Sequence, residues 1–112
     1  MAKKPEYNYK SLQTEYGKMP PQAVDLEEAI LGSLMLEKDA FITVSDFLKP
    51  ECFYKEAHQK IYRGIQNLSL NNEPVDILTV SEEMKRLGEL EEIGGYYYLA
   101  QLTSKVASAA HI

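Results

Sequence analysis

Residues 53–68 read FYKEAHQKIYRGIQNL, and this stretch decides the fold class. Its apolar side chains recur every three or four residues, at Tyr54, Ala57, Ile61, Ile65 and Leu68. Its charged side chains fall mainly between them. Such spacing places the apolar groups along one face of an α-helix. The stretch therefore predicts an amphipathic helix, and the segments on either side of it indicate that it is one of several.

The segment 22–36, QAVDLEEAILGSLML, has the same helical periodicity. Its apolar stripe consists of Leu26, Ile30, Leu31, Leu34 and Met35. Gly32 lies inside this pattern, where glycine costs a helix about 1 kcal/mol relative to alanine. Close approach of another backbone is the usual reason for accepting that cost. We therefore expect a second helix to cross at Gly32.

A shorter helix is expected next. Asp39 can cap it, and its apolar side chains are Phe41, Ile42, Val44, Phe47 and Leu48. It should end at Pro50, because the residue before a proline disfavours helical geometry.

Two further helices have recognisable ends. Asp76 can cap a helix that carries Ile77, Val80, Met84 and Leu87, and Gly88 can close it in a left-handed conformation. Gly94 and Gly95 predict a tight turn, and a fifth helix follows from Tyr96 through Val106. No segment alternates apolar and polar residues strongly enough to demand a sheet. The sequence predicts an all-α fold, a compact orthogonal bundle of about five to six helices.

The chain divides into three parts. Residues 1–20 show no hydrophobic period and end in a proline, so we expect a flexible N-terminal arm. Residues 21–106 form the helical head domain, and residues 107–112 look like the opening of another helix. No apolar run reaches the length of a membrane span or a signal core. We therefore expect a cytoplasmic protein with no membrane partner.

Charge favours protein partners over nucleic acid. The 112 residues carry a formal net charge of −5, yet residues 1–20 contribute +2, which leaves −7 for the rest. Binding DNA requires clustered lysine and arginine to neutralise phosphates. We expect no direct contact between the head domain and nucleic acid. A helix-turn-helix reading fails for the same reason, since no helix is basic.

No segment matches the phosphate-binding pattern G-x-x-x-x-G-K-[ST], so the chain should not be an ATPase by itself. His58 and His111 are the only histidines, and neither has a partner at metal-ligand spacing. His58 falls on the core face of its helix, which favours a hydrogen-bonded interior or boundary residue. We expect no catalytic residue, no cofactor site and no metal site in this chain.

The remaining reactive side chains have structural interpretations. The adjacent carboxylates at 27–28, 82–83 and 91–92 should lie on solvated faces, because neighbours on a helix point about a hundred degrees apart. Cys52, the only cysteine, is expected to be a partly buried, inert thiol. Eight tyrosines are the unusual surplus. Tyr98 should lie at the edge of the core, while Tyr96 or Tyr97 faces outward; interface and structural roles remain equally open for each.

Five pieces of the chain, in this order, resemble the N-terminal domain of DnaB-family replicative DNA helicases. They are PPQAVDLEEAILGSLML, FLKPECFYKEAHQKIY, EPVDILTVSEEM, LEEIGGYYYLAQL and SAAHI, which together extend along most of residues 20–112. The resemblance implies a non-catalytic helical head followed by a helical hairpin, whose start would be residues 107–112. ATP and Mg²⁺ would then bind only in a separate motor domain.

The resemblance also implies partners. In such proteins six N-terminal domains form a collar that receives primase and, in some species, a helicase loader. It places candidate partner-binding residues at Asp25, Tyr97 and Tyr98. A free-standing or phage-derived adaptor with the same fold remains an alternative, which a reading frame that continues into a phosphate-binding loop would exclude.

Overall fold

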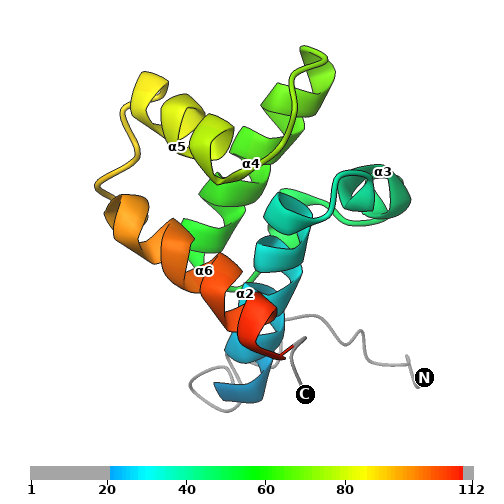
Figure 1. The fold of residues 1–112 in the computed structure, drawn as a ribbon, viewed down its shortest axis with the longest axis vertical. Coiled ribbons are helices and arrows are strands. Elements are labelled where there is room, and N and C mark those ends of the chain that lie inside the picture. Colours follow the sequence, from blue (N-terminus) through cyan, green and yellow to red (C-terminus); the bar gives the residue numbers. More distant parts are fainter. Residues whose placement is uncertain (1–20, 110–112) are drawn as a thin grey trace, which may run out of the picture.

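The computed structural model describes residues 21–109, so the predicted arm and the last three residues lie outside the described part. Its helices are α2 (Pro21–Leu36), α3 (Ala40–Val44), α4 (Glu56–Leu70), α5 (Ile77–Arg86) and α6 (Gly95–Ala109), with a short 3₁₀ helix, η1 (Pro50–Cys52) (Figure 1). No strand occurs within residues 21–109. The predicted all-α class is confirmed.

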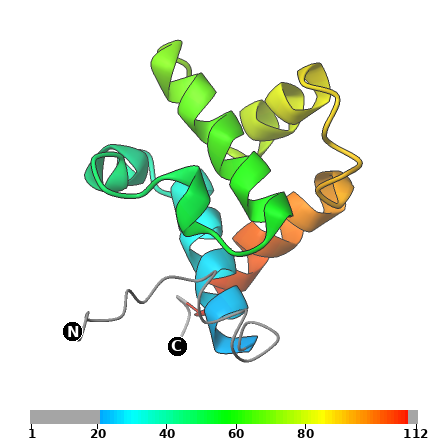
Figure 2. The ribbon, with the colours of Figure 1, turned by 180° about the vertical axis from the view of Figure 1, so that it is seen from behind.

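The helices cross at steep angles around one core. α2 and α6 have the most extensive contact, and α5 packs on both α4 and α6. Figure 2 shows that α3 extends to one side of this group. The buried core draws on every long helix and on the connections: Leu31, Leu34, Met35, Phe53, Ile61, Tyr62, Ile65, Leu68, Val80, Met84, Ile93, Leu99 and Leu102.

Gly32 marks the point where α2 and α6 cross. A Cβ atom added there would lie 2.7 Å from Cγ2 of Val106 and 3.0 Å from the carbonyl carbon of Leu102, and it would also overlap the Leu102 oxygen. Such contacts are closer than a methyl group tolerates. The absence of a side chain at Gly32 thus permits the approach of the α6 backbone.

α5 begins and ends with local signals that the sequence made visible. The Thr79 N–H donates to Asp76 Oδ1 at 2.9 Å, and Thr79 Oγ1 accepts the Asp76 N–H at 2.9 Å, which forms a capping box. At the other end Gly88 has a φ of 74°. The Glu89 N–H then donates to the Met84 carbonyl at 2.9 Å, as in a Schellman motif.

The second helix is shorter than predicted. α3 ends at Val44, and Asp39 makes no side-chain hydrogen bond as its cap. The run Ile42, Thr43 and Val44 is β-branched, which weakens a helix. The Tyr62 hydroxyl also donates to the Leu48 carbonyl at 2.6 Å and so fixes that segment outside a helix. Pro50 consequently opens η1 instead of ending the preceding helix.

Three other expectations were wrong. Leu26, predicted within the apolar stripe of α2, is 59% exposed. The buried face of α2 is rotated instead toward Leu31, Leu34 and Met35. Cys52 is exposed, since η1 lies at the surface. Ser108 and Ala109, expected to open a new helix, continue α6 without a break.

Candidate functional site

A buried carboxylate joins α2 to the start of α4. Glu27 is only 2% exposed, and its Oε2 accepts the Tyr54 N–H at 2.6 Å. Its Oε1 lies 2.7 Å from Nδ1 of His58, which is fully buried, and 3.4 Å from the Lys55 nitrogen. Glu27 therefore accepts N–H groups of the segment that leads into α4, and it places its negative charge near the helix N-terminus that favours it.

Tyr98 of α6 continues this network on the other side of the imidazole. Its hydroxyl oxygen is 2.7 Å from His58 Nε2 and 3.0 Å from Glu28 Oε2. The rings of His58 and Tyr98 stack with 6.0 Å between centroids and 8° between planes. The Lys55 ammonium lies 5.5 Å from the centroid of the Tyr98 ring. The Tyr98 side chain is half-buried, and its hydroxyl group contacts His58 and Glu28 within the head domain.

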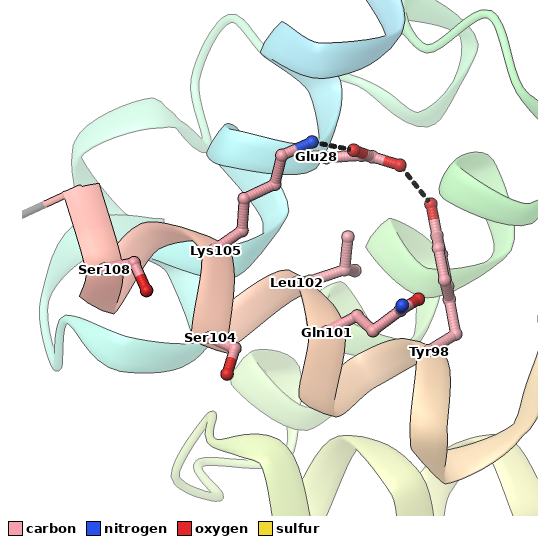
Figure 3. A pocket seen from close by; sticks show the side chains of 7 residues that line it. All are labelled: Glu28, Tyr98, Gln101, Leu102, Ser104, Lys105 and Ser108. Carbon is pink, nitrogen blue, oxygen red and sulfur yellow. Dashed lines mark hydrogen bonds and ion pairs between the residues drawn. The ribbon is translucent and has the colours of Figure 1, made fainter.

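The network reaches the surface through Lys105. Its Nζ lies 2.5 Å from Glu28 Oε1 and 3.2 Å from Asp25 Oδ1. Lys105, Glu28 and Tyr98 lie along an open pocket between α2 and α6 (Figure 3). The volume of this pocket is about 430 Å³. The pocket is lined by Glu28, Tyr98, Gln101, Leu102, Ser104, Lys105 and Ser108. We call this pocket the α2–α6 pocket.

Burial and hydrogen bonds set the protonation states of His58, Glu28 and Tyr98. Burial lowers the pKa of His58, although the hydrogen bond to Glu27 acts in the opposite direction. Partial burial acts to raise the pKa of Glu28, but hydrogen bonds from Lys105 and Tyr98 outweigh it and lower that pKa. Burial and the Glu28 carboxylate raise the pKa of Tyr98. Near neutral pH this group therefore holds a neutral imidazole, an ionised Glu28 and an intact phenol.

Two of the three residues predicted to face a partner belong to the hydrogen-bonded network around His58. Asp25 and Tyr98 are linked through Lys105 and Glu28. Tyr97 does not line the α2–α6 pocket, and it is 73% exposed on another face of α6. Gly94 and Gly95, with φ of 111° and 75°, form the turn that starts α6 and so positions both tyrosines.

The prediction of solvated carboxylate pairs was wrong for Glu27 and for Glu83. Glu83 is 7% exposed and accepts hydrogen bonds from Arg86 and, at 3.1 Å, from Asn67 of α4. Both carboxylates have partners on other elements, which the spacing within one helix does not reveal. One signal did exist for Glu27: a histidine predicted on a core face requires a buried hydrogen-bond partner.

A second surface feature is apolar. Between α2 and α3 lies an open groove of about 350 Å³, lined by Ala29, Ile30, Ser33, Leu34, Ala40, Thr43 and Val44. Leu26 is close by in sequence on α2 and is largely exposed, as are Ile42 and Phe47 at 70% and 67%.

Within residues 21–109, no three histidine, cysteine or carboxylate side chains are placed to share a metal ion. In the same part of the chain, no helix combines the length and the apolar character that crossing a membrane requires.

Similar proteins identify the domain. The family model described as DnaB-like helicase N terminal domain matches residues 19–112. The replicative DNA helicase DnaB of Rhodothermus marinus is 47% identical over 102 residues, which cover 91% of this chain and 11% of the relative. That of Geobacillus stearothermophilus is 41% identical over 95 residues, covering 85% and 21% respectively.

A solved structure agrees with these relatives. The crystal structure of the N-terminal domain of DnaB helicase from Mycobacterium tuberculosis superimposes with a TM-score of 0.74 at 43% identity. The match covers 79% of this chain and 64% of that one. The chain spans only about a tenth to a fifth of the two helicases above. Residues 19–112 match the family model over nearly the whole chain, and the protein belongs to the family of DnaB-like helicase N-terminal domains.

Proposed function

We propose that this chain is the assembly and docking domain of a replicative DNA helicase, which joins copies of the helicase into a ring and receives primase and a helicase loader. The family match along residues 19–112 carries the proposal. The chain itself takes part in no nucleotide chemistry; ATP and Mg²⁺ bind in the motor domain of the full-length helicase. The protein acts in the cytoplasm, where the bacterial chromosome is copied.

The surface of the head domain supports this role. Tyr97 is the most exposed aromatic side chain among the described residues, and tyrosine is enriched in protein interfaces. The apolar groove between α2 and α3 adds a concave surface beside exposed Leu26. The acidic charge of the domain disfavours DNA as the direct ligand. Several weak contacts of this kind gain strength when six copies act together in one ring.

Light scattering after size exclusion tests the proposal, with and without purified primase. Two samples are compared: the 112-residue chain, and a longer version that includes the helical hairpin expected after residue 112. We expect the longer version to form dimers or hexamers that bind primase. If neither version associates with itself or with primase, the assembly and docking function is wrong.

Point variants locate the docking surface. Tyr97→Ala and Asp25→Ala should each weaken primase binding at least several-fold without changing the thermal midpoint, because both side chains are exposed. Leu70→Ala is the matched control, since Leu70 is a comparably exposed apolar side chain, 80% accessible at the end of α4. An equal loss in all three variants would show that primase does not use the face predicted from Asp25 and Tyr97.

A further inference from the structure

The buried chain Glu27, His58, Tyr98 and Glu28 contains three contacts that each need one hydrogen. These contacts are Glu27 to His58 at 2.7 Å, His58 to Tyr98 at 2.7 Å, and Tyr98 to Glu28 at 3.0 Å. A neutral imidazole brings one hydrogen and a phenol brings one, whereas ionised carboxylates only accept. Two hydrogens must therefore serve three contacts, and with a neutral His58 the chain is one hydrogen short.

The ends of the chain leave His58 as the place for a third hydrogen. Glu27 already accepts the Tyr54 N–H at 2.6 Å, and Glu28 is paired with Lys105 at 2.5 Å. Both carboxylates are thus held as acceptors. His58 Nδ1 must donate to Glu27, so with a neutral ring Nε2 carries a lone pair. The single phenolic hydrogen of Tyr98 can then satisfy either Nε2 or Glu28.

We infer that this chain is a proton-uptake site that transmits the protonation of His58 to the α2–α6 pocket. When Nε2 binds a proton from solvent, it donates to the Tyr98 oxygen. The phenolic hydrogen is then held on Glu28 Oε2, which it reaches by rotation about the C–O bond, and no covalent bond other than the new N–H is made or broken. All three contacts hold a hydrogen at once, and the network gains one positive charge.

Protonation of His58 changes the hydrogen-bond acceptors that the α2–α6 pocket presents at the surface. Glu28 and Tyr98 both line the α2–α6 pocket (Figure 3). With a neutral His58, the single phenolic hydrogen of Tyr98 is shared between His58 Nε2 and Glu28 Oε2, so Glu28 Oε2 is available for part of the time to water or to a partner's donor. After uptake, that oxygen is occupied by the Tyr98 hydroxyl. Acidification thus removes one hydrogen-bond acceptor from the pocket.

The charged groups that face His58 influence the pH at which it takes up a proton. From α2, Glu27 and Glu28 favour the charged ring; from the segment before α4, Lys55 opposes it. Asp25 and Lys105 pair with each other beyond Glu28. Burial has the largest influence and lowers the pKa of His58, so uptake falls on the acidic side of the ordinary histidine value.

Nuclear magnetic resonance of the 112-residue chain tests the inference. Imidazole ¹⁵N labelling in a His111→Gln background leaves His58 as the only imidazole signal. At neutral pH we expect the tautomer with the proton on Nδ1. During acidification the ¹³Cζ resonance of Tyr98 should shift with the same midpoint as the His58 nitrogens. The other tautomer at neutral pH, or a Tyr98 signal that does not respond at that midpoint, overturns the inference.

A pair of substitutions at Glu28 separates hydrogen counting from simple loss of charge. Glu28→Gln removes the charge but keeps an amide that can either donate to the Tyr98 oxygen or accept its hydroxyl, so the chain is complete with a neutral or a charged His58. Glu28→Met removes the same charge but offers neither a donor nor a good acceptor, so the phenolic hydrogen has no partner at this position once His58 is charged. Both should lower the midpoint of His58, and Glu28→Met should lower it further, because only this variant leaves the Tyr98 hydroxyl without an acceptor when His58 is charged. Equal midpoints in the two variants would contradict the inference.

Discussion

Gly32→Ala should destabilise the head domain because the crossing of α2 and α6 leaves no room for a methyl group. The new Cβ would lie 2.7 Å from Cγ2 of Val106 and overlap the Leu102 carbonyl oxygen, which belongs to a helix backbone and cannot swing away. Overpacking of this kind costs about 1–3 kcal/mol, and a backbone clash belongs at the upper end. Alanine returns about 1 kcal/mol as the better helix former. The free energy of unfolding should therefore fall by about 2 kcal/mol.

Gly64→Ala is the matched control, since Gly64 also lies buried in the interior of a helix. There the added Cβ would meet the Met84 sulfur at 2.8 Å, the end region of a flexible side chain. The gain in helix propensity should offset the rearrangement of Met84 to within about 1 kcal/mol. The two glycines thus differ in what they contact, and not in their helical setting.

Urea denaturation followed by far-ultraviolet circular dichroism measures both variants. In thermal denaturation of the same variants, a loss of about 2 kcal/mol corresponds to a fall of roughly 8–16 °C in Tm for a domain of this size. The slope of the free energy against urea should be unchanged, because the folded state stays compact. A Gly32→Ala variant as stable as the wild type would refute the close approach of α6 at this position.

Three further predictions concern side chains of the caps and of the buried network. In urea titration, Asp76→Ala should lower the free energy of unfolding by about 1 kcal/mol, because it removes the hydrogen bond to Thr79. Asp39→Ala removes no capping hydrogen bond and should have no measurable effect. Tyr98→Phe should lower the free energy of unfolding by about 1–3 kcal/mol, because it leaves His58 Nε2 buried without a partner. Tyr97→Phe, at an exposed site, should leave that free energy unchanged. Equal effects of the two substitutions would contradict the network. Since burial lowers the pKa of His58, the unfolded chain binds its proton first, so the stability present above about pH 6.5 should decline as pH falls through the folded-state pKa. His58→Gln should flatten that part of the stability profile, and an unchanged slope would exclude His58 as its source.

The sequence predicted those parts of the fold that depend on neighbours along the chain. The helical periodicity of 53–68 indicated α4, and Asp76 and Gly88 indicated both ends of α5, because capping residues act within one turn. Gly32 was recognisable because a glycine inside a helical pattern weakens the helix unless a second backbone packs closely against it. The family of the chain was visible too, because five ordered motifs are compared along the whole domain at once.

The candidate site was less accessible, because its hydrogen bonds join residues far apart in the sequence. Glu27 contacts His58 across 31 positions, and Glu28 contacts Tyr98 across 70. Helical spacing assigned both carboxylates to solvent, since it describes one helix in isolation. The orientation of α2 also depends on its packing against α6, which turned Leu26 outward and Glu27 inward. Only the assembled bundle determines which of two neighbouring residues is buried.

The placement of Glu27 has a consequence for how the chain folds. The N–H groups of Tyr54 and Lys55, at the entry to α4, find their acceptor on α2, which precedes them by 27 and 28 positions. The segment that leads into α4 therefore obtains these acceptors only after α2 has docked, so the entry to the helix is completed by a long-range contact. Amide protons at these two positions should exchange with solvent when α2 separates from the entry to α4, so their exchange rates report on the docking of α2.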